Sequence, residues 1–222
     1  MGLSQIFVIC SSPFLCIMFD KFSIFEKIII PAYLILVFLT SFTPAYRTLW
    51  LIENGIAFAL LGTYLLIKYF GFNWSRMALI VIIIACCMQT IGGYYTFINV
   101  PYGGCLDFFG AADRNNFDRL GHFMCGMVAY PLTEYVIRKK IIPSKIYALF
   151  FIVLTLAGIG AIYELIEWGI VQIVEKSTGL TYIAKQGDEW DAQADMFCCT
   201  IGAIIGFLSF ISVDAYYKRL RK

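Results

Sequence analysis

Long apolar runs alternate along this chain with short stretches rich in glycine, proline and charged residues. A helix needs about 20 mainly apolar residues to cross a membrane. Six runs approach or exceed this length, so the pattern predicts an all-α fold, a polytopic membrane bundle of about six transmembrane helices. The predicted spans are Ile28–Phe42, Asn54–Phe70, Met77–Ile98, Leu120–Ile137, Ile146–Val174 and Ala192–Val213.

Composition excludes a soluble domain and indicates one bundle. Hydrophobic residues make up 60% of the chain and charged residues 14%, whereas soluble domains carry about 25% charged residues. No linker separates a second domain, so residues 23–222 are expected to form a single bundle. The apolar piece Gln5–Phe19 is short and contains Pro13. Residues 1–22 are therefore interpreted as an interfacial or re-entrant segment, with a seventh span as the alternative.

Basic residues predict the orientation in the membrane. In the six-span arrangement, 12 of the 17 basic residues lie on the side of both termini, and the remainder lie on the other side. Because Lys and Arg are enriched in cytoplasmic loops, both termini are expected in the cytoplasm. The basic residues are juxtamembrane and are not clustered with base-stacking aromatics, so membrane lipids are the expected partners and nucleic acid is not.

An acidic stretch from Gln186 to Met196 leads into the last predicted span. If a helix begins near Asp188, then Asp188, Asp191 and Asp195 lie on one face at positions i, i+3 and i+7. Carboxylates on a partly dehydrated face need cations, hydrogen-bond donors or protonation. The alternative is a solvated first helical turn, where the helix dipole favours acidic residues.

Two other predicted spans carry ionisable residues near the same membrane face. Asp118 and His122 lie four residues apart at the start of the fourth span, and Glu164 and Glu167 share a face of the fifth. Ionisable side chains within spans are costly and generally face the bundle interior. We therefore expect these residues and the acidic stretch to converge in one outward-facing cavity. The opposite helix ends show no comparable acidic or histidine set.

These side chains are typical ligands of a divalent cation. Carboxylate oxygens favour Mg, Ca or Mn, and an imidazole admits Zn. In this hypothesis His122 is a general base that Asp118 orients, and the two residues form the catalytic pair. The predicted metal ligands are Glu164, Glu167, Asp188, Asp191 and Asp195.

Arginine and polar side chains near that face predict substrate contacts. Arg47, in the first outer loop, is expected either to pair with Glu53 or to bind an anionic group such as a lipid phosphate. Arg114 is a second candidate for holding an anionic headgroup. The predicted substrate-binding residues are Arg47, Arg114, Asn115 and Trp190.

Three motifs together resemble the YjdF-type family of bacterial inner-membrane proteins, over a region from about Ile28 to the C-terminus. More distantly, Asp118-x-x-x-His122-Phe123, a Glu-bearing span and the Asp-x-x-x-Asp that opens the last span are similar to VanZ-like proteins, which are associated with glycopeptide-antibiotic resistance. The resemblance implies an inner-membrane location and supports the candidate site residues named above. It does not indicate which reaction, if any, the family catalyses. The three motifs are Arg114-Asn115 with Asp118-Arg119-x-Gly121-His122, then Tyr163-Glu164-Leu165-Ile166-Glu167-Trp168, then Gln186-Gly187-Asp188-x-Trp190-Asp191-x-Gln193-x-Asp195-Met196.

Two classes of function agree with these observations. The first is a metal-dependent hydrolase or transferase that acts at the outer face on a lipid or lipid-linked envelope substrate. The second is a non-catalytic membrane protein that binds or transports a cation, a proton or a small ligand, or that is structural. Transport would favour a polar stripe running to the cytoplasmic side, and the spans offer little beyond Gln89, Thr90 and Thr155.

Overall fold

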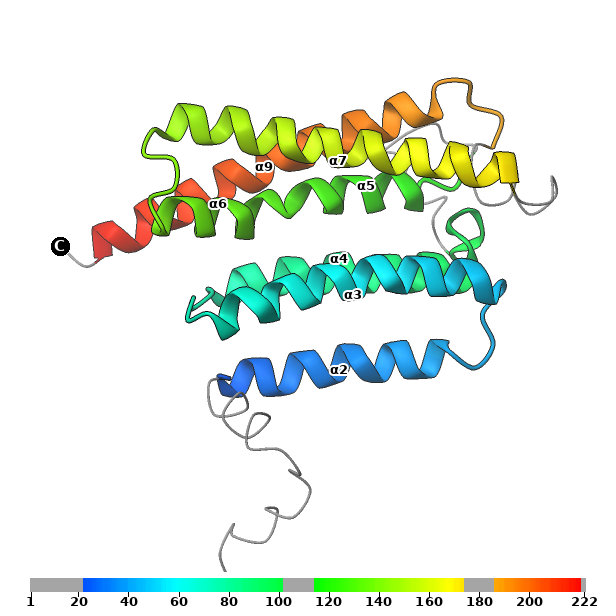
Figure 1. Cartoon of the computed structure of the whole chain (residues 1–222), viewed down its shortest axis with the longest axis horizontal. Helices are drawn as coiled ribbons and strands as arrows, with labels where there is room; N and C mark the ends of the chain where they lie inside the picture. The colour runs from blue at the N-terminus through cyan, green and yellow to red at the C-terminus, as the bar shows by residue number, and fades with distance from the viewer. Residues whose placement is uncertain (1–21, 102–113, 174–185, 221–222) are drawn as a thin grey trace, which may run out of the picture.

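The structure, a computed structural model, describes residues 22–101, 114–173 and 186–220, and these residues form an all-α fold. The predicted segment Gln5–Phe19 lies outside the described residues. Figure 1 shows the helices packed side by side with roughly parallel axes. They are α2 (Ile24–Thr40), α3 (Arg47–Tyr69), α4 (Arg76–Tyr95), the short 3-10 helix η1 (Phe97–Asn99), α5 (Phe117–Met127), α6 (Ala129–Arg138), α7 (Lys145–Ile173) and α9 (Asp191–Leu220).

Four of the described helices, α3, α4, α7 and α9, are long and apolar enough to cross a membrane. Helix α2 has 17 residues and is shorter. The predicted fourth span is not one helix, because it divides at Val128 into α5 and α6. Pro131 accounts for the division, since it has no N–H to donate to the carbonyl of Met127 one turn earlier.

Two helix starts differ from the sequence prediction. Helix α3 begins at Arg47, so the stretch from Arg47 to Asn54 is helical and not a loop. Helix α9 begins at Asp191, so Asp188 lies in the turn before the helix and not on its face. The amphipathic pattern near a membrane surface does not distinguish a helical turn from a loop, which explains both errors.

The bundle has two groups of helices that α4 joins. Helices α2, α3 and α4 share a core that includes Tyr33, Leu61 and Cys86, and α6, α7 and α9 share a second core around Ile152 and Phe207. Figure 1 shows α2 on one side, α7 and α9 on the other, and α4 and α5 between them. Ala78 and Val81 of α4 pack against Tyr130 of α6 and Phe210 of α9, and this third cluster connects the groups.

Glycines bring α5 and α9 into close contact. A Cβ added to Gly126 would overlap the carbonyl oxygen of Cys199, and one added to Gly202 would overlap the carbonyl oxygen of Phe123. Small residues at such crossings allow helix backbones to approach closely in membranes. Gly126 lies one turn after His122 on α5, and its contact Cys199 lies one turn after Asp195 on α9. The crossing therefore determines how far apart the His122 and Asp195 side chains lie.

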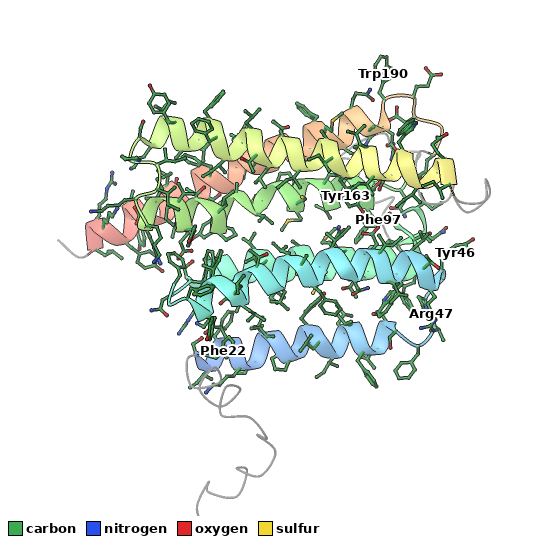
Figure 2. All side chains as sticks on the ribbon, in the orientation of Figure 1. Phe22, Tyr46, Arg47, Phe97, Tyr163 and Trp190 are labelled. Carbon is green, nitrogen blue, oxygen red and sulfur yellow. The ribbon has the colours of Figure 1, made fainter. Side chains whose placement is uncertain are left out.

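The alternating directions of the helices place all the polar stretches singled out in the sequence at one end of the bundle. Helices α3, α5 and α9 begin at this end, and α2, α4 and α7 finish there (Figure 1). Trp190 marks it in Figure 2, and we call it the Trp190 end. The other end, where α9 finishes, is called the C-terminal end.

Candidate metal centre

Three side chains from two helices form a buried group with the geometry of a metal site. Asp118 and His122 lie one turn apart on α5, and Asp195 lies in the second turn of α9. One ligand atom from each lies within 4.8 Å of the other two, and all three residues are buried. Ligands bound about 2.1 Å from one ion lie roughly 3 to 4 Å apart, so a small contraction would close these side chains around a cation.

Helix α7 adds two glutamates to this group. Nε2 of His122 lies 3.1 Å from Oε1 of Glu164 and 3.8 Å from Oδ1 of Asp118. Glu167 is buried, and it is close enough to Asp118, Glu164 and Asp195 for their charges to interact. We call the set Asp118, His122, Glu164, Glu167 and Asp195 the carboxylate cluster. The cluster contains four carboxylates and one imidazole, and such an excess of carboxylates favours a bound cation.

Two oxygens of the carboxylate cluster have no hydrogen-bond partner among the described residues, Oδ1 of Asp195 and Oε1 of Glu164. Oδ1 of Asp195 is buried and has no hydrogen-bond partner among the described residues, and Asp195 as a whole is only 2% exposed. An unsatisfied buried carboxylate oxygen is costly, and such atoms in folded proteins generally bind a proton, water or an ion. Asp195 therefore points to a ligand in the cluster.

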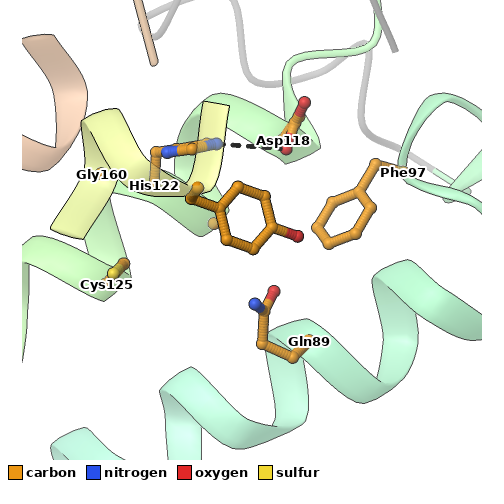
Figure 3. Close-up of a pocket in the computed structure, with 8 residues that line it drawn as sticks. Gln89, Phe97, Asp118, His122, Cys125 and Gly160 are labelled. Atoms are coloured by element: carbon orange, nitrogen blue, oxygen red, sulfur yellow. Dashed lines mark ion pairs between the residues drawn. The ribbon is translucent and has the colours of Figure 1, made fainter. Parts of the chain in front are cut away.

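A small pocket opens beside His122. Its volume is about 30 Å³, and its walls include Gln89, Phe97, Cys125 and Tyr163. Figure 3 shows His122 and Asp118 on one side of the pocket and Gln89 and Phe97 facing them. A water molecule needs about 10–15 Å³, so the pocket has room for an ion with a water or two and is too small for a lipid headgroup.

Glu53 is a buried residue near this pocket whose role the sequence analysis missed. It is 1% exposed, and its carboxylate accepts hydrogen bonds of 2.9 and 3.0 Å from the hydroxyl of Tyr163. The Tyr163 ring contacts the His122 ring edge to face, with 5.4 Å between centroids. A signal was present in the sequence, because Glu53 lies one turn after Trp50 on the same helical face.

Arg47 does not pair with Glu53. It is exposed and donates to the backbone carbonyls of Ser41 and Phe42, which lie in the connection between α2 and α3. The structure therefore places Arg47 at the edge of the Trp190 end and away from the carboxylate cluster, as Figure 2 shows.

Two arginines pair with the first two aspartates of the acidic stretch. Arg114 lies 2.5 Å from Asp191 and 3.3 Å from Asp188, and Arg119 also pairs with Asp188. The backbone N–H of Trp190 and the Arg119 guanidinium hold the pKa of Asp188 below its usual range. The structure thus brings only Asp195 of the acidic row into the carboxylate cluster. Asp188 and Asp191, also predicted as metal ligands, have arginine partners.

Arg114 retains hydrogen-bonding capacity after forming these pairs. Its Nε and Nη2 atoms are buried and have no hydrogen-bond partner among the described residues. Buried guanidinium groups in proteins normally use more of their donors. The ion pairs with Asp188 and Asp191 therefore leave donors on Arg114 for an anion.

The remaining predicted substrate residues lie near the arginines. The side-chain amide of Asn115 donates to the carbonyls of Ile98 and Val100, and its backbone exchanges two hydrogen bonds with the side chain of Gln186. Asn115 therefore joins the segments before α5 and α9. Trp190 is 69% exposed and extends away from the bundle in Figure 2.

Comparisons with known proteins agree with the resemblance seen in the motifs. Inner membrane protein YjdF of Escherichia coli (strain K12) is 35% identical over 115 residues, which cover 51% of this chain and 54% of that protein. The matched region thus spans about half the length of this relative. No solved structure matches the chain. A family model described as a predicted membrane protein (DUF2238) matches residues 25–215, and the chain is therefore an integral membrane protein of the DUF2238 family.

Proposed function

We propose that this protein is a metal-dependent hydrolase or transferase of the bacterial inner membrane that acts at the outer face on a lipid or lipid-linked phosphate. The observation that carries the proposal is the buried group Asp118, His122 and Asp195, whose ligand atoms lie within 4.8 Å of one another. Two carboxylates and one imidazole suit Zn or Mn, and the neighbouring glutamates add oxygen ligands of the kind that Mg and Ca prefer.

The proposed orientation has six membrane crossings with both termini in the cytoplasm. Helices α3, α4, α7 and α9 supply four crossings. The fifth is α5 followed by α6, which together extend from Phe117 to Arg138. The sixth is α2, whose length of about 25 Å requires slight local thinning of the bilayer. The distribution of Lys and Arg and the inner-membrane name of the relative support this arrangement.

The residues around the carboxylate cluster have distinct proposed roles. Asp118, His122 and Asp195 would hold the cation, and a cation there would supply Lewis-acid activation of water and of a phosphoryl oxygen. Glu164, 3.1 Å from the His122 imidazole, accepts the proton of the attacking water. His122, expected from sequence to act as the base, thereby becomes a ligand.

The unused donors of Arg114 support a phosphate substrate over an acyl substrate. Guanidinium groups bind phosphate oxygens through two parallel hydrogen bonds. Arg119 lies one turn before His122 on α5, and Arg114 lies in the segment that precedes this helix. In this proposal a phosphate that enters from the outer face binds these arginines before it reaches the cluster. It replaces Asp188 and Asp191, which pair with the arginines in the structure.

The second candidate is a non-catalytic cation-binding protein. It is favoured by the volume of the pocket, about 30 Å³, which accommodates an ion without a substrate. Polar contacts also continue inward from the cluster: Thr90 donates to Asn54 at 2.8 Å and lies 3.2 Å from the hydroxyl of Tyr33. These contacts would support an ion or proton site between α2, α3 and α4.

Metal titration tests the shared element of the two candidates. The full-length protein, purified in detergent without chelators, is titrated calorimetrically with Mn²⁺ and Zn²⁺. We expect Asp195→Asn to weaken binding by about 100-fold, because it removes a charged ligand while conserving shape. Asp214→Asn is the matched control, since Asp214 lies on the same helix and pairs with Lys218 at the C-terminal end. Equal metal affinity in Asp195→Asn and the parent would contradict the proposed metal site.

A phosphatase assay separates the two candidates. Release of phosphate from a lipid phosphate in mixed micelles is measured with and without the bound metal. Metal-dependent release that Asp195→Asn abolishes supports the enzyme. Metal binding without release, across phosphomonoester and diphosphate lipids, supports the cation-binding protein.

A further inference from the structure

A wide groove lies at the C-terminal end of the bundle, far from the carboxylate cluster. It has a volume of about 620 Å³ and lies between the start of α4, helix α6 and the last turns of α9. Ligand pockets of proteins have volumes of about 300–1,000 Å³, so the groove is large enough for a phospholipid headgroup. Its lining residues include Arg76, Tyr130, Arg138, Phe210, Tyr217 and Lys218.

Positive charge predominates at the mouth of the groove. Arg76, Arg138 and Lys218 line it, and Asp214 is the one carboxylate among the lining residues. Asp214 pairs with Lys218 at 2.6 Å, and Arg138 pairs at 2.6 Å with Glu134, which is buried behind the groove. Three cations against these two carboxylates leave a net positive charge. The groove is therefore suited to an anion.

Arg76 is the cation that lacks a carboxylate. It is exposed in the first turn of α4 and forms no ion pair with any described residue. Its guanidinium lies 6.0 Å from the centre of the Phe25 ring. The Glu134 carboxylate already accepts hydrogen bonds from Ser75, the N-cap of α4, so the helix N-terminus has an anionic partner. An anion bound in the groove would compensate the remaining charge of Arg76.

Apolar side chains line the groove together with these cations. Met77, Phe210 and Val213 form this apolar wall, and two tyrosines, Tyr130 and Tyr217, lie beside the cations. Tyrosine is enriched at membrane interfaces, where its ring lies in the apolar layer and its hydroxyl lies at headgroup level. A free phosphate would contact only the cations, whereas a phospholipid would also cover the apolar wall.

We propose that this groove binds an anionic phospholipid, with its phosphate at Arg76 and Lys218 and an acyl chain along Met77, Phe210 and Val213. Basic pockets between membrane helices on the cytoplasmic side are recurrent binding sites for anionic headgroups. The proposal is independent of the metal-dependent activity, because Asp195 of the carboxylate cluster lies in the second turn of α9 and the groove is lined by the last turns of the same helix, whose two ends Figure 1 shows at opposite ends of the bundle.

Lipid titration of the full-length protein in neutral detergent tests the proposal. Binding of dioleoylphosphatidylglycerol and dioleoylphosphatidylcholine is measured by native mass spectrometry. We expect the anionic lipid to bind at least about tenfold more tightly, and Arg76→Gln/Lys218→Gln to remove that preference. Lys145→Gln/Arg219→Gln is the matched control, because it removes equal charge at the same end from residues outside the groove.

Each other outcome contradicts the proposal. Equal binding of the two lipids would show that the groove does not recognise charge. An equal loss in the control variant would show attraction to overall charge and not to this groove. Displacement of the lipid by micromolar inorganic phosphate would identify the free ion as the ligand. Lys218→Met, at a residue 68% exposed in its side chain, repeats the test if the double variant does not fold.

Discussion

Buried carboxylates lie at both ends of this bundle, but their surroundings differ. At the C-terminal end, Glu26 accepts hydrogen bonds from the backbone and side chain of Ser23 and from Tyr64, and it pairs with Lys68 at 2.7 Å. Glu134 accepts two hydrogen bonds from Ser75 and pairs with Arg138. These are two separate glutamates on different helices, and each has several hydrogen-bond donors and a cation as partners.

At the Trp190 end the balance is reversed. The carboxylate cluster contains four carboxylates and the imidazole of His122, and Oδ1 of Asp195 and Oε1 of Glu164 have no hydrogen-bond partner among the described residues. A buried carboxylate with matched partners is tolerated in the fold, and removing one of those partners is destabilising because it leaves an uncompensated charge. An unmatched group of carboxylates lowers stability and is retained where it binds something. The comparison thus separates structural acidic residues from candidate ligand-binding ones.

The largest expected effect comes from breaking a satisfied pair. Lys68→Met leaves the carboxylate of Glu26 buried without its cation, and we expect the free energy of unfolding to fall by about 3–5 kcal/mol. Both side chains are less than a tenth exposed, so the carboxylate would remain largely buried without its cation. Unfolding in detergent is followed by circular dichroism. Glu26→Gln/Lys68→Met should recover most of the loss, and failure to recover it would mean that Lys68 acts through packing alone.

A smaller effect is expected from separating the helices that assemble the carboxylate cluster. Gly202→Ala places a methyl group against the carbonyl of Phe123, and such overpacking costs about 1–3 kcal/mol. Because α9 then moves away from α5, metal affinity should fall together with stability. Gly158→Ala is the control, since nothing lies within 4 Å of its added Cβ. Parallel losses in both variants would indicate a general effect of changing glycine in these helices.

The third prediction concerns the sign of the change at the unmatched end. Asp118→Asn removes one negative charge from the carboxylate cluster, so in a chelator the protein should become about 1 kcal/mol more stable. The same change at a satisfied carboxylate, Glu134→Gln, should destabilise it. Thermal unfolding of both variants with EDTA measures the contrast. Destabilisation of equal size in both would show that the two ends are alike.

The smallest effect is expected at Asp188, whose side chain is 32% exposed. Its folded-state pKa is lowered by the Trp190 backbone N–H and by Arg119, so its contribution to stability is present above the unfolded pKa of about 3.9. That contribution is lost as the pH falls through the folded pKa. Asp188→Asn should therefore lose less stability than the parent between pH 5 and pH 3. Glu189→Gln, at the exposed neighbour, is the control, and an equal change in both variants over this pH range would contradict the prediction.

The sequence by itself determined the class of the protein and the residues to inspect. Hydropathy and helical periodicity are local properties, so they located the apolar helices and placed Asp118, Glu164 and Asp195 toward one end of the bundle. Motif similarity likewise depends only on the order of residues, and the family assignment confirms it. Local rules also missed the division of the fourth span at Val128, because an apolar run continues through it.

Only the tertiary structure decided which charged side chains contact one another. The start of α9 at Asp191 and the glycine contact between α5 and α9 direct Asp195 toward His122 and leave Asp188 and Asp191 to the arginines. Pairs such as Glu53 with Tyr163 join residues more than a hundred positions apart. No local pattern encodes these contacts, because they depend on how helices cross, and the crossing is set by side-chain packing along their whole length.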